Sequence, residues 1–157
     1  MPPYRILFIC HGNIFRSAFA HHRLLALLSD RAHLVSIRSA GTQARPGEPS
    51  PAVVLDGARV YDLDLSGHAS TLLTKDLLDW ATHIYAMQDD MLDAVRELSP
   101  GAANRARLLG ALDPEARDSQ IPDVGGDGST EVSVAKRFAR IDDLLRRFIA
   151  REQLETP

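Results

Sequence analysis

The sequence predicts an α/β fold: a single doubly wound domain with a four-stranded parallel sheet flanked by helices on both faces. Short apolar runs alternate along the chain with segments of helical periodicity, an order typical of βαβ units. The length of 157 residues fits one domain of ordinary size. The content of 45% hydrophobic and 25% charged residues is close to the globular average. We therefore expect residues 1–157 to form one domain.

The start of the chain predicts a strand, a tight loop and a helix. Residues 4–10 (YRILFIC) are almost continuously apolar, as in a strand buried on both faces of a parallel sheet. Residues 11–13 break this run, and apolar residues fit a helix over residues 16–29. Ligands of doubly wound sheets bind beyond the carboxyl ends of the strands, and Cys10 lies at such an end.

The rest of the chain repeats this alternation more loosely. Further strands are expected at residues 33–40, 82–87 and 105–109, and further helices at residues 51–60, 74–80, 89–98 and 129–152. The hydroxyl of Thr74 is expected to cap the short helix that follows it. Loops are expected at residues 41–51 and 110–129, and a loop as long as the second is often functional. The last helix has an apolar stripe, beside which a solvated basic rim is expected at Arg137, Arg140, Arg146 and Arg147.

Charge, hydropathy and cysteine content exclude several classes of protein. The net charge of −3 leaves no electrostatic footprint for binding nucleic acid. The apolar runs are far shorter than the roughly 20 residues that cross a bilayer, and no secretory signal is visible, so we expect a cytoplasmic protein without membrane contact. Cys10 is the single cysteine, which excludes an internal disulfide and a multi-cysteine metal site.

Residues 10–17 (CHGNIFRS) indicate a phosphate-binding loop between the first strand and the first helix. Gly12 and Asn13 tolerate the left-handed backbone of a tight loop, whose amides bind anions together with the helix N-terminus. Arg16 offers a planar fork to two phosphate oxygens. The same surroundings favour the thiolate form of Cys10, a nucleophile aimed at phosphorus. Ser17 is placed to donate a hydrogen bond to the sulfur.

This segment, with Ile9 before it, resembles the signature of the low-molecular-weight protein tyrosine phosphatases. That family carries the signature at its N-terminus, whereas other cysteine phosphatases carry their Cys-x5-Arg late in the chain. The resemblance continues in order through SAGT at 39–42, SGH at 66–68, AM at 86–87 and IPD at 121–123. It implies a two-step hydrolysis of phosphotyrosine in proteins, without a metal or other cofactor.

The resemblance also implies a role for each site residue. Cys10 would attack the phosphorus and form a phosphocysteine, Arg16 would stabilise the phosphoryl oxygens, and Asp123 would protonate the leaving oxygen and then activate water. Asp123 is preferred to Asp113 and Asp127 because it follows Ile-Pro and precedes Gly-Gly and the last helix. The remaining predicted substrate-binding residues are His11, Gly12, Asn13, Ile14, Phe15 and Ser17, and a network of Asn13, Ser17, Ser39 and His68 would hold the loop.

Several residues depart from the family pattern. Phe15 stands where most members have a second cysteine, so the protective disulfide cannot form, and its side chain is expected under the loop or at the pocket mouth. Gln88 replaces an aspartate after the third strand. His21 and His22 are adjacent on a helix and are expected to face different directions. His11 is expected to be a solvent-facing loop residue.

The sequence is compatible with more than one substrate. Aromatic residues that flank the substrate ring in the family are scarce here, although Ile14 suits a planar aromatic group and relatives that act on phosphoarginine tend to carry a smaller residue there. The alternatives are a phosphatase for a small phosphate ester, an arsenate reductase that uses an external thiol, and a non-catalytic phosphate binder. The sequence indicates no oligomeric state.

Overall fold

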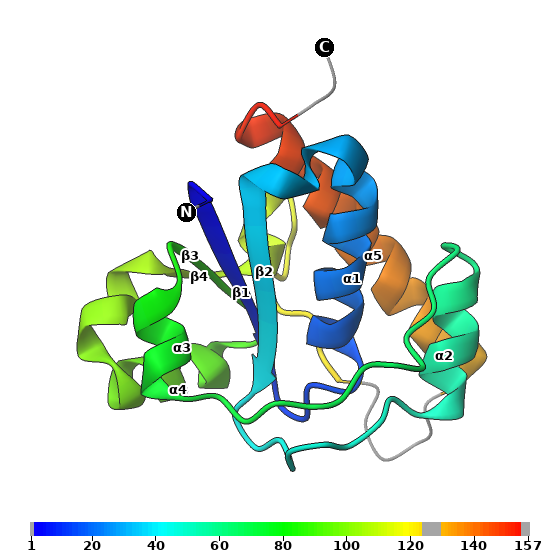
Figure 1. The fold of residues 1–157 in the computed structure, drawn as a ribbon, viewed down its shortest axis with the longest axis horizontal. Helices are drawn as coiled ribbons and strands as arrows, with labels where there is room; N and C mark the ends of the chain where they lie inside the picture. Colours follow the sequence, from blue (N-terminus) through cyan, green and yellow to red (C-terminus); the bar gives the residue numbers. More distant parts are fainter. Residues whose placement is uncertain (1, 124–129, 155–157) are drawn as a thin grey trace.

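The computed structural model describes residues 2–123 and 130–154, and in that part of the chain four parallel strands form one sheet (Figure 1). The strand order is β2-β1-β3-β4. The strands span Tyr4–Cys10 (β1), Val35–Gly41 (β2), His83–Ala86 (β3) and Ala106–Leu108 (β4). Because the chain moves outward from β1 to β2 and then crosses to β3 on the other side, its direction reverses at β1, where such sheets bind ligands.

Helices cover both faces of the sheet, as the sequence predicts (Figure 1). On one face α1 packs against α5, which also contacts α2, and on the other face α3 and α4 contact the sheet. Their bounds are Arg16–Leu28 (α1), Ala52–Arg59 (α2), Lys75–Trp80 (α3), Asp89–Leu98 (α4) and Glu131–Arg151 (α5). The short 3-10 helices at Ser29–Leu34 (η1), Pro100–Arg105 (η2) and Leu109–Leu112 (η3) were not predicted.

The core lies between the sheet and these helices. From Ile6 to Cys10 every residue of β1 is at most 2% exposed, which confirms a strand covered on both faces. The predicted apolar stripe of α5 is buried, and the ring of Phe138 stacks on Phe19 of α1 with centroids 3.8 Å apart. This packing holds α5 against α1, the helix that follows Cys10.

Helix caps agree with local chemistry. The hydroxyl of Thr74 accepts a hydrogen bond from the amide of Leu77 over 3.3 Å, which confirms the predicted cap of α3. Thr130 caps α5 in the same way by accepting from the amide of Ser133 over 3.2 Å. Helix α5 therefore begins two residues later than expected, and position 129, its predicted first residue, lies outside the described residues.

The ends of β1 and β2 lie close enough to position the loop after Cys10. A Cβ on Gly41 would lie 2.3 Å from the carbonyl oxygen of His11, so only glycine allows this approach. Beyond it, the amide of Thr42 donates to the carbonyl of Cys10 and the amide of Gln43 donates to that of His11, both over 2.9 Å. The segment after β2 therefore supports the backbone of the loop that follows β1.

Candidate active site

Asn13 is the residue that organises the loop between β1 and α1. It is fully buried and its φ is 55°, in the left-handed region that asparagine tolerates. Its side-chain amide donates to the hydroxyl of Ser17 over 2.8 Å, and its side-chain oxygen accepts from the amide of Thr71 over 2.9 Å. Its backbone carbonyl faces Nε2 of His68 over 2.7 Å. These bonds tie the loop to the segment before α3.

Cys10 lies beneath this loop and is 2% exposed. Its sulfur is 2.9 Å from the hydroxyl oxygen of Ser17 and accepts from the amide of Asn13 over 3.3 Å. A thiolate sulfur has no hydrogen and can only accept, so the hydroxyl of Ser17 donates to Cys10 when the thiol is ionised. Two donors therefore face the sulfur, and they stabilise negative charge on it.

Arg16 is the charged residue at the start of α1, and it is only 1% exposed. Its Nη1 donates to Oε1 of Gln88 over 2.7 Å and to the carbonyl of Ile121 over 2.8 Å. Its Nη2 lies 3.8 Å from Oδ2 of Asp123. A buried guanidinium held largely by neutral acceptors keeps most of its charge available to an anion.

Among the predicted acids, Asp123 is the one that the structure brings to Arg16. Its side chain is 53% exposed and lies next to the buried guanidinium. Asp113 instead lies 3.8 Å from Arg147 on α5 and accepts from the amide of Glu115 over 3.0 Å. These contacts occupy Asp113 in a local turn and a helix contact. Asp127 lies outside the described residues.

Of the predicted supporting residues, His68 contacts the loop directly and Ser39 does so only through other side chains. The carbonyl of Asn13 can only accept, so Nε2 of His68 carries the hydrogen. Ser39 makes no described hydrogen bond to the loop. Its hydroxyl instead lies 3.0 Å from Nδ1 of His21. It reaches His68 through His21 and His22, since Nε2 of His22 lies 3.4 Å from Nδ1 of His68.

The expectation that His21 and His22 face different directions is wrong. Their rings stack with centroids 4.5 Å apart and planes 10° apart. Both side chains bend into a cavity of about 260 Å³ that His68 and Arg38 also line. Burial, followed by the effects of His22 and His68, lowers the pKa of His21 from 6.5 to about 3. Burial also lowers the pKa of His22, followed by the effect of His68.

The other loop side chains take different positions. His11 is half-buried and its Nε2 lies 2.5 Å from Oδ2 of Asp90 on α4, so it is paired where a solvent-facing residue was expected. The ring of Phe15 is 7% exposed and meets Phe138 edge-on, with centroids 5.4 Å apart. Phe15 therefore packs under the loop, and only its backbone can contact a ligand. Gly12 and Ile14 are half-buried.

Contacts that were not predicted from the sequence hold the segment before Asp123. Arg140 of α5 donates to the carbonyls of Gln120, over 2.7 Å, and of Asp118. Arg137 donates to the carbonyl of Pro122 over 3.1 Å. Both arginines were expected in a solvated rim, yet both are half-buried. Their position beside the apolar stripe was the one available signal, and it does not identify a partner.

Within residues 2–123 and 130–154, histidine, cysteine, aspartate and glutamate form no group of three that could hold a metal ion. In the same part of the chain, no helix has the length and apolar character needed to cross a membrane.

The loop thus carries a buried cysteine, whose sulfur accepts from the amide of Asn13, and a buried arginine that lies 3.8 Å from a carboxylate. Phosphatases that use a cysteine need these three groups. The profile of the family described as "Low molecular weight phosphotyrosine protein phosphatase" matches residues 5–156. The chain therefore belongs to this family and is a cysteine-based phosphatase, a phosphoric monoester hydrolase.

Individual relatives agree with this assignment. The chain is 32% identical to a "Protein-arginine-phosphatase" of Geobacillus stearothermophilus over 155 residues, covering 98% of this chain and 99% of the relative. It is 33% identical over 141 residues to a "Low molecular weight protein-tyrosine-phosphatase" of Streptomyces coelicolor, covering 82% and 84%. The solved structure of the YwlE arginine phosphatase from Geobacillus stearothermophilus superposes with a TM-score of 0.84 at 28% identity, covering 96% and 94%.

Proposed function

We propose that this protein hydrolyses phosphotyrosine in proteins, with Cys10 as the nucleophile and Asp123 as the general acid and base. The contact that supports this most strongly is the one between Nη2 of buried Arg16 and Oδ2 of Asp123. It joins the loop that carries Cys10 to a carboxylate far along the chain. A phosphoryl group bound by Arg16 and the loop amides would therefore lie between a sulfur and a proton donor.

In the first step the sulfur of Cys10 attacks phosphorus, and the bond from phosphorus to the tyrosine oxygen breaks. Asp123 gives its proton to that oxygen, while Arg16 and the loop amides hold the other phosphoryl oxygens. In the second step Asp123 takes a proton from water, which attacks phosphorus, and the sulfur leaves as a thiolate. The hydroxyl of Ser17 stabilises this leaving sulfur through the 2.9 Å contact.

Ile14 favours an aromatic substrate, because its branched apolar side chain is half-buried in the loop and can pack against a flat ring. A second candidate is phosphoarginine in proteins, which is favoured by the name of the Geobacillus relative. A small phosphate ester is the third. We also propose a cytoplasmic location, since the single cysteine must stay reduced to act.

Hydrolysis of p-nitrophenyl phosphate and of phenyl phosphate by four proteins tests the residue roles. We expect Cys10→Ser to abolish turnover and to leave no trapped phosphocysteine in rapid-quench experiments. We expect Asp123→Asn to lower kcat for phenyl phosphate by about 10² to 10³. The matched control Asp113→Asn keeps kcat within about twofold of wild type, because its described partners, Glu115 and Arg147, lie outside the phosphate loop. Turnover that survives Cys10→Ser, or an equal loss in both aspartate variants, would contradict the assignment.

The substrate is tested by kcat/KM on two peptides of identical sequence that carry phosphotyrosine or phosphoarginine, with a sugar phosphate as a third substrate. We expect the phosphotyrosine peptide to be preferred by at least about tenfold, a difference of about 1.4 kcal/mol in transition-state binding. A preference for phosphoarginine would replace the proposed substrate and leave the residue roles intact.

A further inference from the structure

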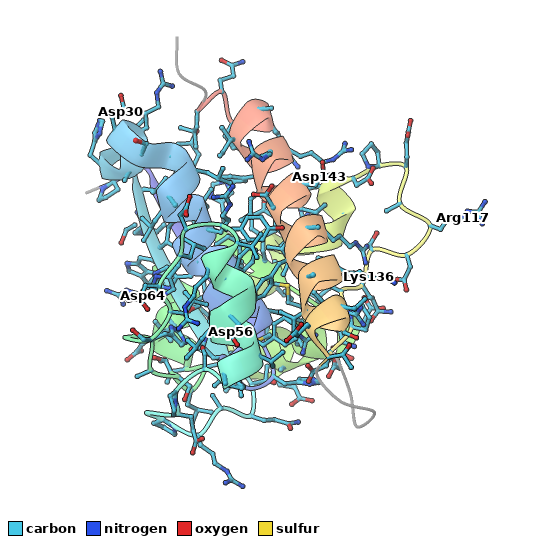
Figure 2. All side chains as sticks on the ribbon, turned by 90° about the vertical axis from the view of Figure 1, so that its right-hand side faces the viewer. Asp30, Asp56, Asp64, Arg117, Lys136 and Asp143 are labelled. Carbon is cyan, nitrogen blue, oxygen red and sulfur yellow. The ribbon has the colours of Figure 1, made fainter. Side chains whose placement is uncertain are left out.

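The loop that leads to Asp123 is held from the side by α5. Residues 113–123 contain no helix or strand, so their carbonyls must find partners outside regular structure. Figure 2 shows this loop, marked by Arg117, running beside α5, whose outer surface is marked by Lys136 and Asp143. Arg140 donates to the carbonyls of Asp118 and Gln120.

Arg137 and Arg140 extend from a part of α5 whose backbone is held in place by the core. Positions 137 and 140 lie one turn apart on α5 and therefore share a face of the helix. Phe138 and Ile141, next to them in sequence, are fully buried, so packing in the core fixes the backbone from which both arginines extend. The planar guanidinium of Arg140 donates to two loop carbonyls at once, which restrains the loop more than a single donor would.

The opposite side of the loop is pinned to the catalytic centre. Ile121 is fully buried, and its amide donates to the carbonyl of Met87 over 2.8 Å. Its carbonyl accepts from Nη1 of Arg16 over 2.8 Å. Residues 118–122 are thus clamped between α5 and the phosphate loop, and Asp123 follows this clamp directly.

We propose that Arg140, assisted by Arg137, is a positioning residue that holds Asp123 where it can transfer a proton to the leaving group. The proposal rests on the proposed role of Asp123 as the acid. Proton transfer needs heavy atoms about 2.6–3.2 Å apart, and a displacement of about 1 Å can cost about 10² in rate. Loss of the two carbonyl contacts would release one side of the clamp three and five residues before Asp123, while the bonds of Ile121 to Met87 and Arg16 remain.

Leaving-group dependence separates this role from a structural one. A phenolate that leaves easily needs no protonation, whereas phenol itself does. We therefore expect Arg140→Met to lower kcat/KM for phenyl phosphate by about tenfold and kcat/KM for 2,4-dinitrophenyl phosphate by less than about twofold. The comparison uses kcat/KM because that constant reports the first step, in which the leaving group departs, whereas kcat also contains the second step, in which Asp123 acts as the base. The ratio of the two values is measured on one protein sample, so partial unfolding does not change it. Inhibition by inorganic phosphate should stay within about twofold of wild type.

Arg146→Met is the matched control, because Arg146 lies on the same helix and pairs with Asp142 of that helix. It should leave the ratio unchanged. Arg140→Met combined with Asp123→Asn should be no slower on phenyl phosphate than Asp123→Asn alone, since both changes remove one function. Equal losses on both esters in Arg140→Met, or additive losses in the double variant, would overturn the proposal. A flat leaving-group dependence in Asp123→Asn would instead overturn the proposed acid.

Discussion

At the scale of single residues, the positive charge of Arg16 is only partly neutralised by its neighbours. The buried guanidinium donates to the neutral amide of Gln88, and the carboxylate of Asp123 is 3.8 Å away and half-exposed. The aspartate that the family resemblance led us to expect at position 88 would have neutralised more of this charge. Gln88 thus anchors Arg16 without weakening its attraction for a phosphate dianion.

Replacing Gln88 by glutamate tests this balance. Gln88→Glu keeps an acceptor for Arg16 and adds a negative charge beside it, so we expect the inhibition constant of inorganic phosphate to rise about tenfold. Asn104→Asp adds the same charge at an exposed position on η2 and should change it by less than about twofold. Equal inhibition constants in wild type and Gln88→Glu would show that the neutral amide does not set phosphate affinity.

At the scale of elements, close backbone contacts place the loop of Asp123 next to the sheet. A Cβ on Gly110, in η3, would lie 1.9 Å from the carbonyl oxygen of Ser119. Both groups belong to the backbone, so neither can rotate away. The course of the chain from β4 to Asp123 therefore requires glycine at position 110, together with the arginine contacts from α5.

We expect Gly110→Ala to destabilise the protein by about 1–3 kcal/mol, because the added methyl group forces the loop away from η3. The same shift should lower kcat for phenyl phosphate. Gly101→Ala is the control, because a Cβ there has no neighbour within 4 Å among the described residues. Urea unfolding and steady-state kinetics measure both effects. Equal stability of the two alanine variants would contradict the close contact with Ser119.

At the scale of the whole molecule, one continuous cluster of buried apolar residues joins the sheet to the helices of both faces. The expectation that residues 1–157 form one domain stays a prediction, and this cluster agrees with it. The histidine cluster behind the phosphate loop is a polar exception. It makes the folding free energy depend on pH, since burial and the neighbouring histidines lower the pKa of His21 to about 3.

The sign of this dependence follows from proton uptake. Unfolded His21 binds a proton below about pH 6.5, whereas the folded state binds it only near pH 3, so stability is complete above pH 6.5 and falls as the pH drops toward 3. His21→Gln should take up about one proton fewer on unfolding in this pH range. The free energy of unfolding, measured with urea, should therefore fall less steeply between pH 6.5 and 4.5 than in wild type. His33→Gln, at an exposed position that bonds only locally in the described structure, should keep the wild-type slope. An unchanged slope in His21→Gln would contradict the shift.

Local patterns were sufficient for much of the fold. The apolar run of β1, the stripe of α5 and the Thr74 cap depend on neighbours within a few residues, and all three are found where they were predicted. The side chain of Phe15 and the stacking of His21 on His22 were not predictable in the same way. Which way these side chains turn depends on the space that Phe138 and His68 leave, and both are distant in sequence.

The chemistry of this protein was predictable from one short segment, since a cysteine, a tight loop and an arginine must be close in sequence to surround a single phosphate. Only the tertiary structure decided how that segment meets the rest of the chain. The bond from Arg16 to the carbonyl of Ile121 spans 105 positions, and those from Arg140 to Gln120 and Asp118 join a helix to a loop. Carbonyl groups are common to all residues and leave no pattern in the sequence, so the docking of α5 alone determines which of them the arginines hold.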